Sequence, residues 1–136
     1  DSFNELMAAM RMKKTPEEAA ARDRAIADAT KHAIEVPLGV LQRTVRASEL
    51  AEEVAQRGNR NSLSDAGVAA LAALGCAEGA YYNVLINLAD LDDPEWSEAT
   101  VEAATTALAR VREIVGRVTK HVEETLAEAA RTPQRT

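Results

Sequence analysis

The last third of the chain carries apolar residues at alternating intervals of three and four. A helix with 3.6 residues per turn collects such positions on one stripe, and this spacing favours neighbouring helices that cross at shallow angles. Asp93-Pro94-Glu95, a capping residue followed by proline, is typical of a helix start. The sequence predicts one long helix from there, with a stripe made of Val101, Ala104, Leu108, Val111, Val115, Val118 and Val122.

A second long helix is predicted from Thr15-Pro16-Glu17-Glu18 to about Gln56. Thr15 suits the N-cap, Pro16 the first helical position, and Glu18 completes a capping box. Pro37 lacks a backbone N–H, so a kink or break is expected there, and Gly58 ends the helix. Two apolar stripes are expected to face the core: Ile26, Thr30, Ala33, Pro37, Val40, Thr44, Ala47, Ala51 and Val54, and Ile34, Leu38, Leu41 and Val45.

Two further helices are predicted, from about Ser2 to Met12 and from near Asn61–Asp65 to about Ala89. Nearly every residue from Ala66 to Ala80 is small or apolar, so both sides of this helix are expected to be packed. Its glycines lower helix propensity, which indicates close approach of a neighbour at Gly67, Gly75 and Gly79. The fold class expected is all-α, an antiparallel up-and-down bundle of long helices over residues 1–131, with a frayed tail at 132–136.

Composition supports this class and excludes others. Apolar residues make up 46% of the chain and aromatic residues 3%, so alanine, leucine and valine must build the core. The net charge of −6 disfavours nucleic acid and anionic membrane surfaces as partners. No charge-free apolar run reaches membrane-spanning length, and the lone Cys76 fits a reducing cytoplasm.

The sequence contains no standard catalytic or cofactor motif. His32 and His121 lie far apart on different predicted helices. They are therefore interpreted as helix-surface residues, because a metal site needs three or four convergent ligands. No metal and no cofactor are expected.

Two groups of polar residues each allow a structural and a ligand-binding interpretation. The stretch from Gly58 to Asp65 is either a turn with helix caps or a place where a polar ligand meets a helix N-terminus. Asn83 and Asn87, four residues apart, either form hydrogen bonds between helices or face a polar pocket. Glu78 likewise lies at a solvent edge or is paired in the interior.

Several stretches, in order over roughly residues 1–90, resemble the formiminotetrahydrofolate cyclodeaminase and methenyltetrahydrofolate cyclohydrolase family. The most specific is Gly58–Asp65 with Gly67-Val68-Ala69-Ala70. The others are Asp1–Met7 with Arg11 and Lys13, Thr15–Glu18, Glu35–Leu38 and Asn83–Leu88. Family members usually carry an N-terminal helical segment with a Pro-Gly-Gly-Gly-Ser-like turn, which this sequence lacks.

The resemblance implies chemistry at the one-carbon bridge between N5 and N10 of tetrahydrofolate. Cyclodeamination of 5-formiminotetrahydrofolate gives 5,10-methenyltetrahydrofolate and ammonia, whereas a cyclohydrolase interconverts the methenyl and 10-formyl forms. Both need proton transfer but neither a metal nor a redox cofactor. A third interpretation is a non-catalytic helical module that binds folate or assembles the enzyme. A homodimer or higher oligomer is expected, because broad apolar faces need covering.

Asp65 is the predicted catalytic acid or base, or the partner of the pterin amide. Lys13, or Arg22 or Arg24, is predicted to attract the glutamate tail of the folate, and Asp1 and Asn4 are weaker candidates for substrate binding. The complete set of predicted substrate-binding residues is Asn59, Asn61, Ser64, Asn83, Asn87, Lys13, Asp1 and Asn4.

Overall fold

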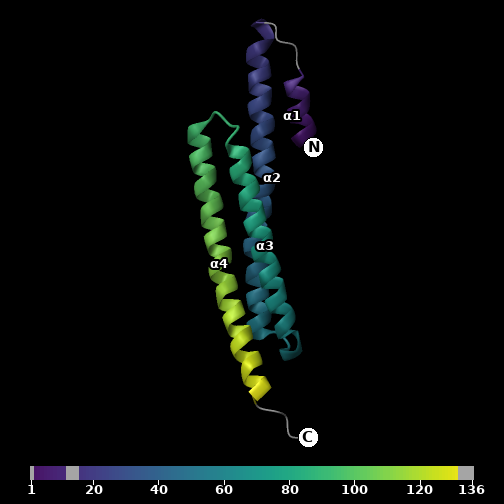
Figure 1. Cartoon of the computed structure of the whole chain (residues 1–136), viewed down its shortest axis with the longest axis vertical. Coiled ribbons are helices and arrows are strands. Elements are labelled where there is room, and N and C mark those ends of the chain that lie inside the picture. Colours follow the sequence, from purple (N-terminus) through teal and green to yellow (C-terminus); the bar gives the residue numbers. More distant parts are fainter. Residues whose placement is uncertain (1, 12–15, 132–136) are drawn as a thin grey trace.

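The computed structural model describes residues 2–11 and 16–131, and helices account for almost all of them. Figure 1 shows the long helices running up and down side by side, with a short helix beside the upper part of the first long one. The elements are α1 (Ser2–Met10), α2 (Pro16–Arg57), the 3₁₀ turn η1 (Arg60–Ser62), α3 (Leu63–Leu88) and α4 (Pro94–Arg131). The all-α antiparallel bundle is confirmed. Thr15, the predicted cap of α2, lies outside the described residues.

The core lies between α2, α3 and α4. Six of the seven positions in the predicted α4 stripe are buried, and Val101 alone among them is exposed. α3 contributes a buried series with the same three-four spacing, which we call the inner seam: Leu63, Ala66, Ala70, Ala73, Ala77, Ala80 and Val84. Because most of these side chains are methyl groups, the flanking helices can approach closely and bring their own larger residues together.

The two stripes predicted on α2 have different environments. Ile34 and Leu41 of the second stripe are fully buried. The first stripe is mixed, because Thr30, Thr44 and Ala51 are buried whereas Val40 and Val54 are exposed. α2 also runs through Pro37 without interruption, so the expected break does not occur. The reason is a side chain from α3, described below.

The expectation that both sides of α3 are packed is wrong for the described residues. Opposite the inner seam, α3 carries a second three-four series that is open to solvent, which we call the outer seam. Val68 is 67% exposed and Ile86 69% exposed. Gly67 does have a close neighbour, since a Cβ there would lie 3.2 Å from Val122, whereas a Cβ added at Gly75 or Gly79 would meet no described residue of another element within 4 Å. The outer seam consists of Val68, Ala72, Gly75, Gly79, Tyr82 and Ile86.

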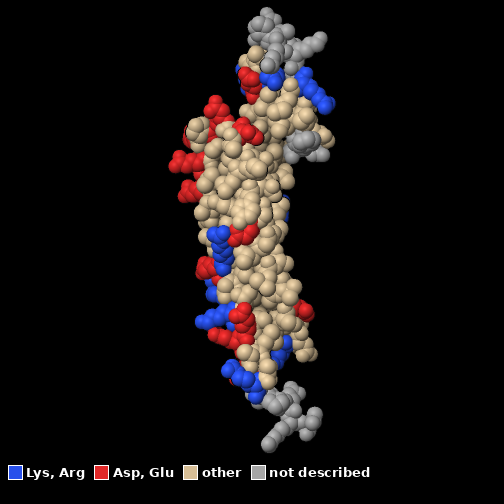
Figure 2. All heavy atoms as spheres, in the orientation of Figure 1, with Lys and Arg blue, Asp and Glu red and all other residues tan. Residues whose placement is uncertain are grey.

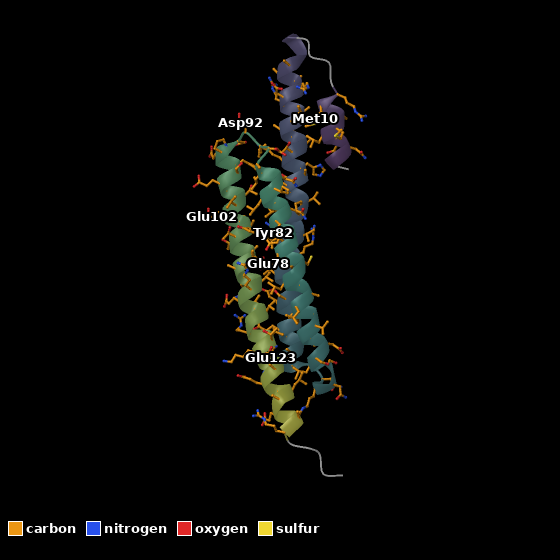
Figure 3. The ribbon with its side chains drawn as sticks, in the orientation of Figure 1. Met10, Glu78, Tyr82, Asp92, Glu102 and Glu123 are labelled. Carbon is orange, nitrogen blue, oxygen red and sulfur yellow. The ribbon has the colours of Figure 1, made fainter. Side chains whose placement is uncertain are left out.

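By length and a mean hydropathy of 1.3, the stretch Arg60–Leu88 passes a composition test for a membrane-crossing helix. In the structure this stretch packs against both α2 and α4. Glu78, near its middle, forms a two-pronged ion pair with Arg112 of α4, with N–O distances of 2.8 and 3.0 Å. Glu78 therefore lies, partly exposed, at the bundle edge and is paired (Figure 3).

Paired charges also join α2 to α4. Arg117 donates two hydrogen bonds to Glu52, at 2.7 and 3.1 Å, and a third to Glu113 at 2.6 Å. These hydrogen bonds lower the pKa of Glu52 and raise the pKa of Arg117. Exposed pairs contribute little to stability individually, but two-pronged pairs hold α4 at a defined rotation over α2.

Asp93 precedes α4, caps its N-terminus and bonds to a residue of α2. One carboxylate oxygen accepts the backbone N–H of Trp96 at 3.2 Å, as predicted for a cap, and the other accepts Lys31 at 2.7 Å. The Lys31 ammonium also lies 5.4 Å from the centre of the Trp96 ring. Together, the hydrogen bonds from Lys31 and Trp96 lower the pKa of Asp93 from its ordinary value of 3.8.

We expect Asp93→Ala to lower the melting temperature by a few degrees at neutral pH, because the variant loses both the cap and the Lys31 pair. A depressed carboxyl pKa stabilises the fold above the unfolded-state pKa, and this contribution is lost as pH falls through the folded-state pKa. The gap between wild type and variant should therefore narrow in melts below pH 3.8. Asp92→Ala, at the exposed neighbouring position, is the control and should melt like wild type.

Candidate functional site

The predicted polar loop folds as a tight turn between α2 and α3. The backbone N–H of Gly58 donates to the carbonyl of Val54 at 2.8 Å and ends α2. A Cβ on Gly58 would lie 2.4 Å from that carbonyl oxygen, so this position requires glycine. Asn59 then caps η1, because its side-chain oxygen accepts the backbone N–H of Asn61 at 3.0 Å. The cap interpretation holds for Asn59.

Ser64 and Asp65 are not caps, so the cap alternative that the sequence left open for this stretch does not hold for them. α3 begins at Leu63, so both residues lie within its first turn, and the preceding Ser62 makes no side-chain capping bond. Both side chains are exposed. Because neither forms a hydrogen bond with any described residue, the Asp65 carboxylate and the Ser64 hydroxyl remain available to a ligand near the positive end of the helix.

An open cleft of about 630 Å³ separates this loop from the end of α4, and we call it the end cleft. Arg60, Asn61 and Leu63 line one side, and Thr125, Leu126, Glu128 and Ala129 the other. A smaller hollow of about 160 Å³ adjoins it, and His121 lies there with Gly58, Asn59 and Arg60. The end cleft therefore presents the guanidinium of Arg60, the amide of Asn61 and the carboxylate of Glu128. The adjoining hollow adds the amide of Asn59 and the imidazole of His121, and together these groups could bind a polar, charged ligand.

Sequence reasoning missed His121 because no motif connects it with the loop. His121 and the loop lie close together only because α4 runs antiparallel to α3 and its end passes beside η1. The spacing of residues in α4 does not indicate this contact, since His121 lies between buried positions of an ordinary apolar stripe.

A second hollow, of about 490 Å³, lies between α2 and α3, and we call it the lateral groove. Its walls are mostly apolar or small: Ala33, Val36, Pro37, Val40, Gly75, Cys76, Gly79, Ala80, Asn83 and Asn87. Asn83 is exposed and makes no side-chain hydrogen bond to a described residue.

Asn87 has a structural partner. Pro37 has no N–H to donate to the carbonyl of Ala33, four residues earlier. The side-chain amide of Asn87 donates to that carbonyl instead, at 3.3 Å. α2 therefore passes through its proline with the orphaned carbonyl satisfied, and Asn87 serves as an interhelical hydrogen-bond donor, one of the two roles considered from the sequence.

The predicted substrate-binding residues separate into two groups. Asn59, Asn61, Ser64 and Asp65 lie at one end of α3 and Asn87 at the other, about 33 Å away along the helix axis at 1.5 Å per residue. Asn4 is exposed on α1, whose Glu5 contacts His32 on α2 at 2.9 Å; the hydrogen bond from His32 is the largest cause of the lowered pKa of Glu5. The predictions for Asp1 and Lys13 fall outside the described residues.

The two arginines proposed for the glutamate tail also lie away from the end cleft. Arg22 donates to the carbonyl of Met10 at 3.5 Å and is half-buried between α1 and α2, whereas Arg24 is exposed. Within residues 2–11 and 16–131, no cluster of three His, Cys, Asp or Glu side chains is arranged to hold a metal ion.

The Pro37–Asn87 relation predicts a measurable coupling. Asn87→Ala should lower the free energy of unfolding by about 0.5–1.5 kcal/mol, the value of one hydrogen bond. In a Pro37→Ala background the restored N–H can bond to Ala33, so the same substitution should cost clearly less. Urea unfolding of the four proteins in this cycle measures the coupling. Asn83→Ala is the matched control and should change stability little; equal costs of Asn87→Ala in both backgrounds would contradict the assignment.

Comparison with known proteins places these observations in a family. Residues 1–106 match the family described as formiminotransferase-cyclodeaminase. Methenyltetrahydrofolate cyclohydrolase from Methylorubrum extorquens is 36% identical over 93% of this chain and 59% of its own length. Formimidoyltransferase-cyclodeaminase from Rattus norvegicus is 41% identical over 65% of this chain and 16% of its own length.

The fold agrees with a solved structure. The formiminotetrahydrofolate cyclodeaminase from Thermotoga maritima superposes with a TM-score of 0.81 and 25% identity, over 92% of this chain and 59% of that one. The chain thus spans less than two thirds of the length of these relatives. With the family match covering the loop from Gly58 to Asp65 and both asparagines of α3, this chain belongs to the formiminotransferase-cyclodeaminase family.

Proposed function

We propose that this chain works in a folate one-carbon enzyme that closes 5-formiminotetrahydrofolate to 5,10-methenyltetrahydrofolate and releases ammonia. The observation that carries the proposal is the loop from Gly58 to Asp65. It lies inside the family match, adjoins the end cleft through Arg60 and Asn61, and leaves unpaired polar groups at a helix N-terminus.

The reaction requires that the enzyme position the folate and transfer protons. N10 attacks the formimino carbon held on N5, which makes a tetrahedral carbon bonded to both nitrogens and to the amino group. N10 loses a proton, the amino group gains one, and the C–N bond to ammonia breaks. Asp65, exposed in the first turn of α3, is our candidate to take the proton from N10 and return it to the leaving nitrogen.

The other loop residues would bind and orient. Asn61 lines the end cleft, Asn59 the adjoining hollow, and Ser64 lies beside Asp65, so amide and hydroxyl groups could meet the pterin ring. Arg60 is better placed than Arg22 or Arg24 to attract a glutamate carboxylate, because it lines the cleft. Since the steps are addition, proton transfer and elimination, we propose that no metal or redox cofactor takes part.

The second candidate reaction is methenyltetrahydrofolate cyclohydrolysis. The match to the Methylorubrum extorquens cyclohydrolase, over 93% of this chain, supports it. Water would attack the bridging carbon, and the tetrahedral carbon would open toward the 10-formyl form. The third candidate is a non-catalytic folate-binding or assembly module.

We propose a cytoplasmic homodimer or higher homo-oligomer as the working form. Large apolar side chains remain exposed on the lower halves of α2 and α3, among them Leu50, Val54 and Leu71, and closed symmetry is the commonest way to cover such faces. Sedimentation equilibrium at micromolar protein should give a mass at least twice that of the chain, and a monomer throughout would contradict the proposal.

Asp65→Asn tests the catalytic assignment in the native enzyme that contains this chain. The amide keeps the size of the side chain but cannot act as a base. We expect nearly unchanged melting and a loss of at least about 100-fold in turnover, the usual scale for a general acid or base. Initial rates with 5-formiminotetrahydrofolate and with 5,10-methenyltetrahydrofolate check this and separate the two reactions.

Glu98→Gln, at an exposed carboxylate on α4, is the matched control and should retain full rates. An Asp65→Asn enzyme as active as wild type would exclude Asp65 as the base. Absence of both activities in the native enzyme, with folate binding retained, would instead favour the non-catalytic module.

A further inference from the structure

The small hollow beside the end cleft has a polar side and an apolar side. Its polar residues are Asn59, Arg60, His121 and Thr125, and no carboxylate is among the described residues that line it. Leu63 forms part of the apolar side and is only 5% exposed, so the hollow lies directly on the bundle core. Hydrogen bonds and charges act more strongly beside such an apolar wall than in open water.

The hydrogen bonds already made in the hollow occupy its main acceptors. The side-chain oxygen of Asn59 accepts the backbone N–H of Asn61 at 3.0 Å, so the amide N–H groups of Asn59 remain. The hydroxyl of Thr125 donates to the carbonyl of His121 at 2.8 Å, which occupies that backbone acceptor. What remains is chiefly a set of donors: the Asn59 amide, the Arg60 guanidinium and an imidazole N–H of His121.

The two strongest of these donors are unpaired. The side chains of Arg60 and His121 form no hydrogen bond or ion pair within residues 2–11 and 16–131. Other arginines near this end of the bundle do have partners, since Arg57 lies 3.8 Å from Glu53 and Arg117 bonds to Glu52. Arg60 is therefore a cation without a paired carboxylate, at the place where the hollow meets the end cleft.

The charges on α4 also differ between its two ends. From residue 94 to residue 109 each charged residue is acidic, and the first basic residue is Arg110. In Figure 2 acidic side chains line the upper part of α4, whereas basic and acidic side chains are mixed around its lower part. An anionic ligand is therefore repelled at the upper end and meets the unpaired Arg60 at the lower end.

The hollow and the end cleft form one continuous space, because Arg60, Leu63 and Thr125 line both. The hollow measures about 160 Å³. Since a water molecule occupies about 30 Å³, the hollow has room for a carboxylate group and the carbons next to it. The end cleft, at about 630 Å³, has room for the larger remainder of such a ligand.

We propose that the hollow is a carboxylate subsite of the end cleft and that His121 is its specificity-determining residue. Arg60 and His121 donate hydrogen bonds to the two carboxylate oxygens, and the Asn59 amide donates a further one. The inference rests on the proposed function, because the carboxylate belongs to the glutamate at the end of the folate substrate. His121 thus selects folates over pterin compounds without that carboxylate, and takes no part in proton transfer.

Titration calorimetry on the native enzyme that contains this chain tests the subsite with two ligands. One is 5-formyltetrahydrofolate, a stable analogue of the formimino substrate, and the other is its diamide, in which carboxamides replace both glutamate carboxylates. We expect wild type to bind the first at least about 30-fold more tightly, a conservative value for two hydrogen bonds to a charged group. His121→Ala should reduce this preference at least about fivefold without changing the affinity for the diamide. His121→Gln, which keeps an N–H donor, should retain most of the preference.

Glu128 allows a test in the opposite direction. Its carboxylate lines the end cleft but not the hollow and repels an anionic ligand. Glu128→Gln should therefore strengthen the binding of 5-formyltetrahydrofolate about two- to fivefold and leave the binding of the diamide unchanged. His32→Ala and Arg57→Gln are matched controls, since neither residue lines the hollow or the cleft, and both should keep the wild-type preference.

Three results would overturn the subsite. The first is equal affinity of wild type for the two ligands, and the second is an unchanged preference in His121→Ala. The third is displacement of 5-formyltetrahydrofolate by inorganic phosphate at equal concentration, which would make the hollow a general anion site. The proposed function fails separately: an enzyme that turns over neither folate but keeps the His121-dependent preference would still support the subsite.

Discussion

The bundle depends on the narrowness of α3 along its inner seam. Ala70 and Ala77 are fully buried, and their methyl groups leave room for α2 and α4 to meet. Ile34 and Leu41 from α2 then contact the same cluster as Val111 and Ile114 from α4. A larger side chain at these alanines would push the helices apart, since a densely packed interior cannot absorb added volume without strain.

α2 must also stay continuous for this packing to extend over its 42 residues. Pro37 removes one hydrogen bond near its middle, and Asn87 replaces it from the neighbouring helix. This contact explains why an asparagine, a poor helix former, lies near the end of α3. It also fixes the register between α2 and α3, because an amide can satisfy that carbonyl in only one relative position.

The structure separates a polar cleft at the end of the bundle from an apolar groove along its side. The end cleft gathers polar side chains from the α2–α3 turn and from the end of α4, while the lateral groove is lined mainly by small and apolar residues. Asn83 and Asn87 resemble the loop asparagines in chemistry but belong to the groove. A folate site that used both groups would need contributions from beyond the described residues of one chain.

The sequence by itself determined the helices and most of their ends, since periodicity, caps, prolines and Gly58 act within a few residues along the chain. The cap at Asp93, the end of α2 at Gly58 and the α4 stripe could be predicted for that reason. Only the tertiary structure decided which of the two seams on α3 is buried and that His121 lies beside the loop. It also decided that Ser64 and Asp65 have no hydrogen-bond partner among the described residues, and that Asn87 bonds to the carbonyl that Pro37 leaves without a donor. These outcomes depend on which neighbour lies opposite each side chain, and a helix with apolar residues on both faces does not encode which face its neighbour will take.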